Sequence, residues 1–399
     1  MVFASATVFS SLGIVLFAMA GEFHWSDAAA GGAFTVLVLT CCVSHLVPVP
    51  LIARIGGRWT IVCGGAILAL AFLVAAATEN LPTCYLAAGL LGIGFSLVAN
   101  TPAIYLIAGW FGPRAPRMIG IYMMIGTLGG AVGPPVAQTL ISGGGWRLDW
   151  AVMLMVAVML TALCALFIRE PPQAARSADV TDIATAPKVD WGYWATLSSP
   201  QFIVIAMAMV LTQTCIITVS SVTPSHLARI GWSAAFAGQI LGLQGLVGTM
   251  ATGISGWLTE RIDGRLMLTA GLIAEAAGML LLGFAGNAWM LYGFVLVFGV
   301  GWSVSCLAVT VLLVRYFGSR GGTAALATIF TFAGAAAAGP WAAGRIADAT
   351  GSFNLTLGGL GLLLLPVAGA AMAMRAVLHE SPGSLLPQLQ IDRGAVDAA

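Results

Sequence analysis

Charged residues are scarce in this chain of 399 residues. Lys, Arg, Asp and Glu together make up 8% of it, whereas hydrophobic residues make up 59%. A soluble domain carries about 25% charged residues, because its surface faces water. The composition therefore excludes a water-soluble globular protein. Apolar runs of about 20 residues, enough to cross the hydrocarbon core of a bilayer, recur along the whole chain, so the sequence predicts a polytopic membrane protein.

Constellations of catalytic residues are also missing. The sequence has only 4 His and shows no Ser/His/Asp grouping, metal-ligand spacing or Walker loop, which argues against an enzyme or an ATP-driven pump. The 7 Cys lie in apolar runs, as small packing residues do. The formal net charge is +1 without a basic cluster, so nucleic-acid binding is not expected. We expect no cofactor and no metal, with lipid and a small solute as partners of a monomer.

Hydrophobic length predicts twelve transmembrane helices in two sets of six. The runs cover approximately 2–20, 28–52, 59–79, 83–111, 117–141, 148–168, 200–226, 234–258, 265–285, 288–314, 322–346 and 353–374. A polar stretch with Pro171, Pro172 and mixed charges separates the two sets, and its composition is typical of a linker. We expect an all-α membrane protein with an N-terminal six-helix bundle at 1–168, a cytoplasmic linker at 169–198, a C-terminal bundle at 199–378 and a cytoplasmic tail at 379–399.

Basic residues lie mostly on one side of these predicted helices. An even number of spans places both termini on that side, together with all Lys and Arg except Arg147, Arg229 and Arg345. Because basic loops stay in the cytoplasm, the sequence predicts cytoplasmic termini in an inner or plasma membrane. The first run begins at Met1 without a polar or basic flank, which raises the hypothesis that the natural start lies upstream.

The two halves repeat one sequence at an offset of 206–207 residues. The matching pairs include Trp25 and Trp232, Arg54 and Arg261, Gly64 and Gly271, Gly92 and Gly299, and Gly133 and Gly339. So steady an offset indicates two tandem copies of one structural unit, related by pseudo-symmetry. The copies also differ: Glu275 falls at the position of Leu68, an ordinary apolar residue.

The loops after the second and eighth spans carry the strongest local signal. Their glycine, arginines and acid are Arg54, Gly56 and Arg58 in the first copy and Glu260, Arg261 and Arg265 in the second. Glycine permits a tight reversal, and arginine can bind helix C-terminal carbonyls. Both loops resemble the signature loop of the major facilitator superfamily, which has twelve spans in two six-helix halves. The resemblance covers essentially the whole chain and implies a secondary transporter that works by alternating access, with these residues in gating loops.

Shorter segments are similar to the monocarboxylate and oxalate/formate branch of that superfamily. They begin at Glu22, Gly109, Gly145 and Asp348. This similarity implies that the solute is a monocarboxylate or a related organic anion. Proton-coupled transport is a separate hypothesis, which depends on the titratable residues described below.

Two departures from the family pattern bear on this expectation. The first loop has Ala53 where the family places an aspartate, so the N-terminal half lacks its share of any charge pair that closes the gate. Transporters of the branch commonly carry an arginine in the eighth span, whereas this span holds Gln239 and Gln244 and no basic residue. The sequence therefore leaves open an efflux carrier for a neutral or amphipathic solute and, more remotely, a non-transporting membrane sensor.

Two titratable side chains at membrane depth are proton-coupling candidates. An ionised group there costs about 2.5–3.5 kcal/mol on insertion scales. Glu275 lies near the middle of the ninth span with no Lys or Arg at its depth, so we expect the neutral acid. His45 lies on the cytoplasmic side of the second span, and imidazole titrates near neutral pH. The alternatives are a structural role for Glu275 and a hydrogen bond from His45 to a neighbouring helix.

Most candidates for solute binding are polar or aromatic residues at or near the midplane, where two-half transporters build their sites. They are Asn100, Thr101, Tyr122, Gln213, Gln244, Trp302 and Ser303. Such residues also bridge helices, so each has a structural alternative.

Cationic candidates lie at the outer ends of two spans. Arg345 is the basic residue close to a cavity-lining span, so it is the candidate that would attract an anion, unless it pairs with Asp348 at i+3. His226 and Arg229 are spaced the same way at the end of the seventh span. They either share that task or anchor the helix at the interface.

Overall fold

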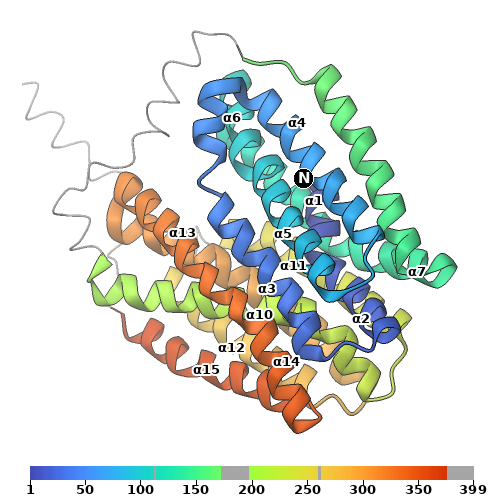
Figure 1. Cartoon of the computed structure of the whole chain (residues 1–399). Helices are drawn as coiled ribbons and strands as arrows, with labels where there is room; N and C mark the ends of the chain where they lie inside the picture. Colours follow the sequence, from blue (N-terminus) through green and yellow to red (C-terminus); the bar gives the residue numbers. More distant parts are fainter. Residues whose placement is uncertain (112–113, 172–196, 259–261, 375–399) are drawn as a thin grey trace, which may run out of the picture.

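Helices account for all the regular structure in the described part of the chain. The computed structural model describes residues 1–111, 114–171, 197–258 and 262–374 (Figure 1). Most of the predicted linker, the predicted tail and the loop residues Glu260 and Arg261 lie outside these ranges.

The N-terminal half begins with one span built from three consecutive helical segments. They are α1 (Val2–Ser5), the π-helix η1 (Ala6–Ser10) and α2 (Leu12–Phe23). The elements that follow are α3 (Asp27–Ser44), α4 (Pro48–Ala76), α5 (Leu81–Val98), α6 (Asn100–Phe111) and α7 (Ala115–Phe167). The backbone leaves the helical conformation at Gly56 inside α4 and at Gly144 and Gly145 inside α7, so each of these elements contains two helices.

The second span is broken earlier than its apolar run predicts. The run extends to residue 52, whereas α3 ends at Ser44 and the chain resumes helical structure at Pro48. Proline has no N–H, and its ring clashes with the carbonyl four residues earlier, which here belongs to Ser44. The prediction of one continuous helix over 28–52 was therefore wrong.

The C-terminal half contains α10 (Pro200–Arg229), α11 (Ala234–Leu258), α12 (Gly264–Gly283), α13 (Ala288–Phe332), the 3-10 helix η3 (Ala333–Ala337), α14 (Ala338–Thr350) and α15 (Asn354–Ala373). The run predicted at 322–346 is also interrupted, at η3. Pro340 accounts for this break as Pro48 does for the first, since its ring would meet the carbonyl of Ala336.

Ten helices in the described part are long and apolar enough to cross a membrane. One of them, Ile121–Phe167, has 47 residues and contains the break at Gly144 and Gly145, so it is long enough for two crossings. The short helix α14 falls below the length of a full span because of the break before it. These lengths are consistent with twelve spans, which stays a prediction as a count.

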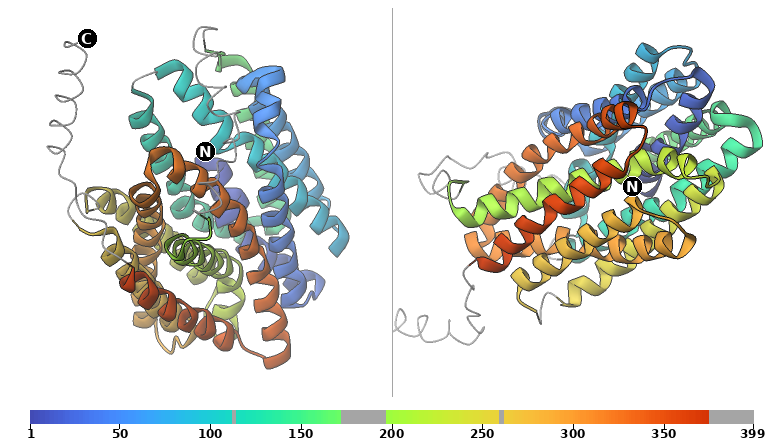
Figure 2. Two further views of the ribbon diagram at one scale, coloured as in Figure 1. Left: turned by 90° about the vertical axis from the view of Figure 1, so that its left-hand side faces the viewer. Right: turned by 90° about the horizontal axis from the view of Figure 1, so that it is seen from below.

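Buried side chains form two main clusters that follow the two sequence halves. One combines residues from α1 to α7 with Ala337 of η3, and Phe34, Phe72 and Leu91 are among its fully buried side chains. The other combines residues from α10 to α15 with Ile14 of α2, and Phe294 and Phe298 are among its fully buried side chains. In Figure 2 most of the blue-to-teal helices and most of the yellow-to-red helices lie on different sides of the molecule, and the halves meet where α14 lies beside α3.

The sequence repeat corresponds to repeated packing. A Cβ on Gly64 would lie 2.6 Å from Leu97 of the next helix, and one on Gly271 would lie 2.5 Å from Ser305 of the next helix. Likewise Gly94 packs against Leu68, whereas Gly301 packs against Glu275. The small residues thus permit the same close helix contact in both halves, and Glu275 occupies the place of a packed leucine.

The helix ends form two opposite faces of the bundle. The turn face carries the short connections near residues 24–26, 144–145, 230–233 and 351–353. The linker face, at the opposite ends of the helices, carries Gly56 and residues 169–171 and 262–263.

Candidate functional site

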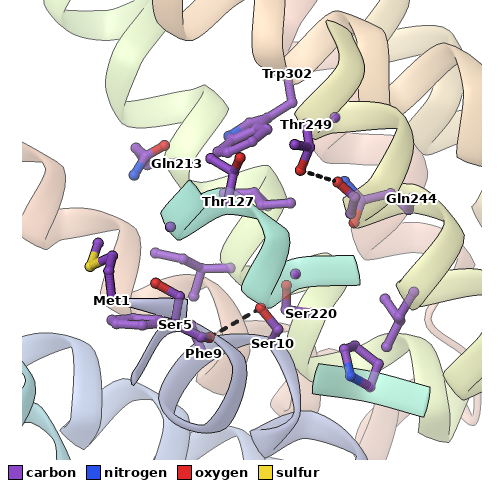
Figure 3. A pocket seen from close by; sticks show the side chains of 18 of the residues that line it. Met1, Ser5, Phe9, Ser10, Thr127, Gln213, Ser220, Gln244, Thr249 and Trp302 are labelled. Atoms are coloured by element: carbon purple, nitrogen blue, oxygen red, sulfur yellow. Dashed lines mark hydrogen bonds between the residues drawn. The ribbon is translucent and has the colours of Figure 1, made fainter. Parts of the chain in front are cut away.

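A cavity of about 390 Å³ lies between the two halves. The first span, α3 and the first part of α7 line it from the N-terminal half, and α10, α11 and α13 line it from the C-terminal half. Its polar side chains are Ser5, Ser10, Thr127, Gln213, Ser220, Gln244 and Thr249, and its aromatic side chains are Phe9, Phe34 and Trp302. Figure 3 shows Trp302, Gln213 and Thr249 opposite Ser5, Phe9 and Ser10. Among the described residues, no Asp, Glu, Lys, Arg or His side chain lines this cavity.

The first span contributes to the cavity through an irregular helix. Ser10 Oγ donates to the carbonyl of Ser5 at 3.2 Å, and Ser11 Oγ donates to the carbonyl of Ala6 at 2.7 Å, each five residues earlier. A five-residue spacing matches the wider turn of the π-helix, which is rare and often found at functional sites. This turn places both Phe9 and Ser10 on the cavity wall.

The opposite wall offers donors and acceptors that a solute can use. Gln213 Oε1 accepts a weak hydrogen bond from Cys306 Sγ at 3.7 Å. Trp302 Nε1 is buried and has no hydrogen-bond partner in the described part of the chain. Because a buried N–H without a partner is costly, a solute acceptor placed here would gain a hydrogen bond.

Contacts between the halves close the cavity toward the turn face. Arg229 of α10 forms an ion pair with Asp27 of α3. The Asp348 carboxylate of α14 accepts from the backbone N–H groups of Asp27 and Ala28, both at 3.1 Å. Nearer the cavity, Gly13 of α2 approaches the carbonyl of Ser220 so closely that a Cβ would overlap it. These contacts join α2 and α3 to α10 and α14 on the turn-face side of the cavity.

A glycine contact holds α7 against α11 beside the cavity. A Cβ on Gly245 would overlap the carbonyl group of Gly130. Farther toward the turn face, Gly242 meets Pro135 and Gly238 meets Gln138. The two helices therefore pack backbone to backbone at Gly245, and the glycines at 242 and 238 leave room for side chains of α7.

Three of the predicted solute-binding residues, Gln213, Gln244 and Trp302, line the cavity together. Ser303 is buried instead at the contact between α13 and α11, where its hydroxyl donates to the Gly248 carbonyl at 2.7 Å. Tyr122 lines a separate groove of about 600 Å³ among Val132, Val136 and Val156. Thr101 is half-buried in α6 away from both, and the side chain of Asn100 lies outside the described part.

The predicted cationic candidates do not reach the cavity. Arg345 is exposed on α14, and the expected pair with Asp348 is wrong, because Asp348 binds the amino end of α3 instead. His226 is buried, with Nε2 2.9 Å from the carbonyl of Leu282 on α12, so it is not an interfacial anchor. Arg229 joins the two halves.

The two proton-coupling candidates differ in their surroundings. His45 is exposed, and its Nδ1 lies 2.6 Å from the Cys41 carbonyl of its own helix rather than a neighbouring one. Glu275 is fully buried, and its Oε1 accepts from Thr212 Oγ1 of α10 at 3.2 Å.

The gating-loop arginines bind the ends of the last helix in each half. Arg58 donates through Nη2 to the Ala165 carbonyl at the end of α7, and Arg265 donates through Nη1 to the Met374 carbonyl after α15 at 2.5 Å. Arg54 is exposed. The first loop itself has no acid at Ala53, but an acid from elsewhere in the chain binds there. Glu170 accepts from the Arg58 backbone N–H at 2.6 Å, as Asp263 accepts from the Arg265 backbone N–H in the second half.

Sequence reasoning missed several residues of the cavity and its surroundings. Ser5, Ser10, Thr127 and Thr249 line the cavity, yet small hydroxyl residues are common in membrane helices and gave no distinct signal. Asp149, a second buried acid whose Oδ1 has no partner in the described part, was detectable as the lone charge within the 148–168 run.

Comparison with known sequences identifies one family. The sequence profile of the Major Facilitator Superfamily matches residues 1–340. The chain is 26% identical over 219 residues to monocarboxylate transporter 13 of Rattus norvegicus and 26% identical over 239 residues to that of Bos taurus. These matches cover 53% and 57% of the chain, and the chain spans only 47% and 52% of the length of these relatives. It is also 26% identical to the MFS-type transporter YdeG of Bacillus subtilis, over 86% of the chain and 83% of that protein.

Solved structures of transporters share the fold. The nucleoside transporter NupG matches with a TM-score of 0.73 and 12% identity, over 93% of this chain and 96% of that one. A point mutant of the peptide transporter POT has a TM-score of 0.74 and 12% identity, over 93% and 92%. A bacterial homologue of the human lysosomal transporter Spinster, in an inward-facing and unoccupied conformation, has a TM-score of 0.69 and 16% identity, over 93% and 89%.

Proposed function

The chain belongs to the major facilitator superfamily and is a secondary transporter, and on that premise we propose that its central cavity binds a small, uncharged or amphipathic solute. One observation carries the proposal: among the described residues, no charged side chain lines the cavity. A buried anion without a cationic partner costs far more free energy than a neutral polar group with hydrogen bonds. The solute would place an apolar body against Phe9 and Trp302 and its polar groups near Gln213 and Gln244.

The contacts between the halves support alternating access. We assign the linker face to the cytoplasm, because most basic residues lie at that end. The turn face, where contacts join the two halves, is then the outer side, as expected of an inward-facing state. For the solute to exchange with the outside, the contacts of Asp27 with Arg229 and Asp348 must separate while the linker face closes.

An organic anion is the second candidate. The observation that favours it is the similarity to two relatives named monocarboxylate transporter 13. That similarity covers about half of each relative, and Arg345, the cation expected to attract an anion, is exposed outside the cavity. Because no charged side chain among the described residues lines the cavity, we rank the organic anion behind the neutral solute.

Isosteric probes can separate the two candidates. Nicotinamide and nicotinate have the same ring and nearly the same size, but only nicotinate carries a negative charge. Scintillation binding to the purified full-length protein, followed by uptake into proteoliposomes, would compare them. The panel would add uridine as a larger neutral probe and lactate as a smaller anion.

We expect saturable binding of at least one neutral probe and at least tenfold weaker binding of its anionic counterpart. Saturable binding of nicotinate or lactate, with none of nicotinamide or uridine, would establish the anion instead. Trp302→Ala should abolish specific binding, whereas Trp289→Ala, at a side chain that is 83% exposed on the same helix, should not.

A further inference from the structure

Glu275 lies inside the C-terminal half, behind the wall of the cavity. Its side chain is 0% exposed, and it does not line the central cavity. Its Oε1 accepts from Thr212, whereas its Oε2 has no hydrogen-bond partner in the described part of the chain. The Ser305 hydroxyl of α13, equally buried, lies beside the carboxyl and also has no completed hydrogen bond. Oε2 of the carboxyl and the Ser305 hydroxyl are thus the two polar groups of this site without a hydrogen-bond partner in the described part of the chain.

Protonation resolves this arrangement. An ionised Oε2 can accept a hydrogen bond from the Ser305 hydroxyl, whereas a proton on Oε2 makes this oxygen a donor to Ser305 Oγ. It also removes the negative charge from a site without a cation. The titratable groups that face Glu275 from the neighbouring helices are the thiols of Cys215 on α10 and Cys306 on α13, and the sequence of α15, which packs on the other side, contains no titratable residue. None of these groups supplies a positive charge.

Packing alone does not explain the acid. The equivalent position in the N-terminal half is Leu68, which is 2% exposed and lies against Gly94 of the next helix, as the backbone of Glu275 lies against Gly301. The fold therefore accepts leucine at this point of the repeat. An acid that replaces it in one half only has a role that the other half does not share.

The neighbours of Glu275 connect it to the cavity wall. Thr212 is adjacent in sequence to Gln213, which lines the cavity. Ser305 is one turn from Trp302, which also lines it, and is adjacent to Cys306, whose thiol contacts Gln213. Reorientation of the two hydroxyls toward an ionised carboxylate would therefore act on α10 and α13, the helices that carry Gln213 and Trp302.

We propose that Glu275, with Thr212 and Ser305, is the proton-binding site that couples solute movement to a proton gradient without itself touching the solute. The proposal rests on the transport function proposed above. Protonated Glu275 belongs to the arrangement described here. Loss of the proton to the linker-face side would draw Thr212 and Ser305 toward the carboxylate and change the cavity wall.

The proton can be observed directly, without a solute. Attenuated-total-reflection infrared spectroscopy of the full-length protein in lipid, titrated with pH in potassium buffers, detects the carbonyl stretch of a protonated buried carboxylic acid. We expect a band that titrates reversibly in the wild type and is absent from Glu275→Gln. Asp149→Asn is the matched control, because Asp149 is the other buried acid with an unpaired oxygen. The band should persist in this variant and titrate at a changed pH in Thr212→Val.

Several outcomes would overturn the proposal. They are an unchanged band in Glu275→Gln, and a band that sodium chloride removes at constant pH, since the site would then bind Na⁺. If Glu275→Gln does not fold, Glu275→Leu restores the residue type of the other half and serves in its place.

Transport measurements provide a second test of the proposal. In proteoliposomes loaded with the nicotinamide or nicotinate probe that the wild type carries, Glu275→Gln should retain exchange within about threefold but lose accumulation driven by a pH gradient. Wild-type transport that ignores the pH gradient overturns the coupling while leaving the transport function intact. A titrating band in a protein that carries none of the probes contradicts the proposed solute class, but not the proton site.

Discussion

Arg229 and Asp27 lie 202 positions apart in the sequence and form an ion pair between the two halves on the turn face. The same segment of α3 also receives Asp348, whose carboxylate accepts from the first two N–H groups of the helix. A carboxylate at a helix N-terminus is favourable, because these N–H groups have no partner within the helix. Two residues of the C-terminal half therefore hold one helix end of the N-terminal half.

We expect Arg229→Ala to increase the population of states in which the turn face is open. The ion pair is partly exposed, with side-chain exposures of 36% for Arg229 and 17% for Asp27. Its loss should cost about 1 kcal/mol, which corresponds to roughly a fivefold change in population. Hydrogen–deuterium exchange should show faster labelling of peptides at 27–35 and 338–350.

Arg147→Ala is the matched control for this change. Arg147 forms an ion pair with Glu22 on the same face, at 2.7 Å, but both residues belong to the N-terminal half. Its removal should leave exchange in 338–350 unchanged. Equal exchange in both variants would show that the Asp27 pair does not hold the halves together.

Gly56→Ala should destabilise the protein more than the same substitution at Gly145. Both glycines have φ near +80°, at 86° and 78°, and extended ψ, a region that other residues avoid at a cost of about 1–3 kcal/mol. Only at Gly56 would the new Cβ also meet the Glu170 carboxylate, at 2.5 Å, and displace it from the Arg58 N–H. Nothing lies within 4 Å of a Cβ at Gly145.

The difference between the two variants isolates the Glu170 contact. A hydrogen bond to a charged group contributes about 1.5–3 kcal/mol, so Gly56→Ala should unfold at a clearly lower temperature than Gly145→Ala in a tryptophan-fluorescence melt. Glu170→Gln in the Gly56→Ala background should then add little. Equal melting temperatures of the two glycine variants would remove the structural role assigned to Glu170.

Gly245→Ala should disrupt the cavity, whereas Gly130→Ala should not, although the two glycines face each other. A Cβ on Gly245 would overlap the carbonyl oxygen of Gly130, which backbone cannot avoid without separating α7 from α11. A Cβ on Gly130 would meet its nearest neighbour at 3.5 Å, an ordinary contact. We expect at least a roughly tenfold loss of probe binding for Gly245→Ala and less than about threefold for Gly130→Ala. Similar losses of probe binding in both variants would show that the overlap between a Cβ at Gly245 and the Gly130 carbonyl is not the cause.

Local sequence was sufficient for the parts of the structure that depend on hydrophobic length and repetition. Apolar runs predicted the helices, and the repeat predicted that Arg58 and Arg265 have related surroundings, as their contacts with the Ala165 and Met374 carbonyls show. The breaks before Pro48 and Pro340 were visible as prolines, but apolar length alone concealed them.

Contacts between distant segments could not be predicted in the same way. Glu170 reaches Arg58 across 112 positions, so the missing acid at Ala53 gave no indication of the residue that takes its place. The sequence offers Arg345, three positions away, as an alternative partner of Asp348, whereas α3 lies beside α14 and provides the N–H groups that Asp348 binds. Depth along a span predicted that Gln213, Gln244 and Trp302 lie near the midplane. The direction of a side chain depends instead on the rotation of its helix, which depth does not reveal. Trp302 therefore lines the cavity, whereas its neighbour Ser303 packs between α13 and α11.

The two glutamines of α11 test whether the cavity binds the solute. Gln244 lines the central cavity and is 6% exposed, whereas Gln239 lies on the same helix in a groove on the outside of α7 and α11, beside Leu243 and Leu246. Leucine resembles glutamine in size but forms no side-chain hydrogen bonds. Loss of one hydrogen bond to a solute costs about 0.5–1.5 kcal/mol, and a solute group left unpaired costs about 1–3 kcal/mol. Gln244→Leu should therefore weaken binding of the preferred probe about tenfold or more, while Gln239→Leu changes it less than about twofold, as measured by scintillation binding at equal protein concentrations.

Because both substitutions make α11 more apolar, insertion and folding of the two variants should be equal, which size-exclusion profiles would verify. Weaker binding in Gln239→Leu than in Gln244→Leu would move the binding site from the central cavity to the outer groove.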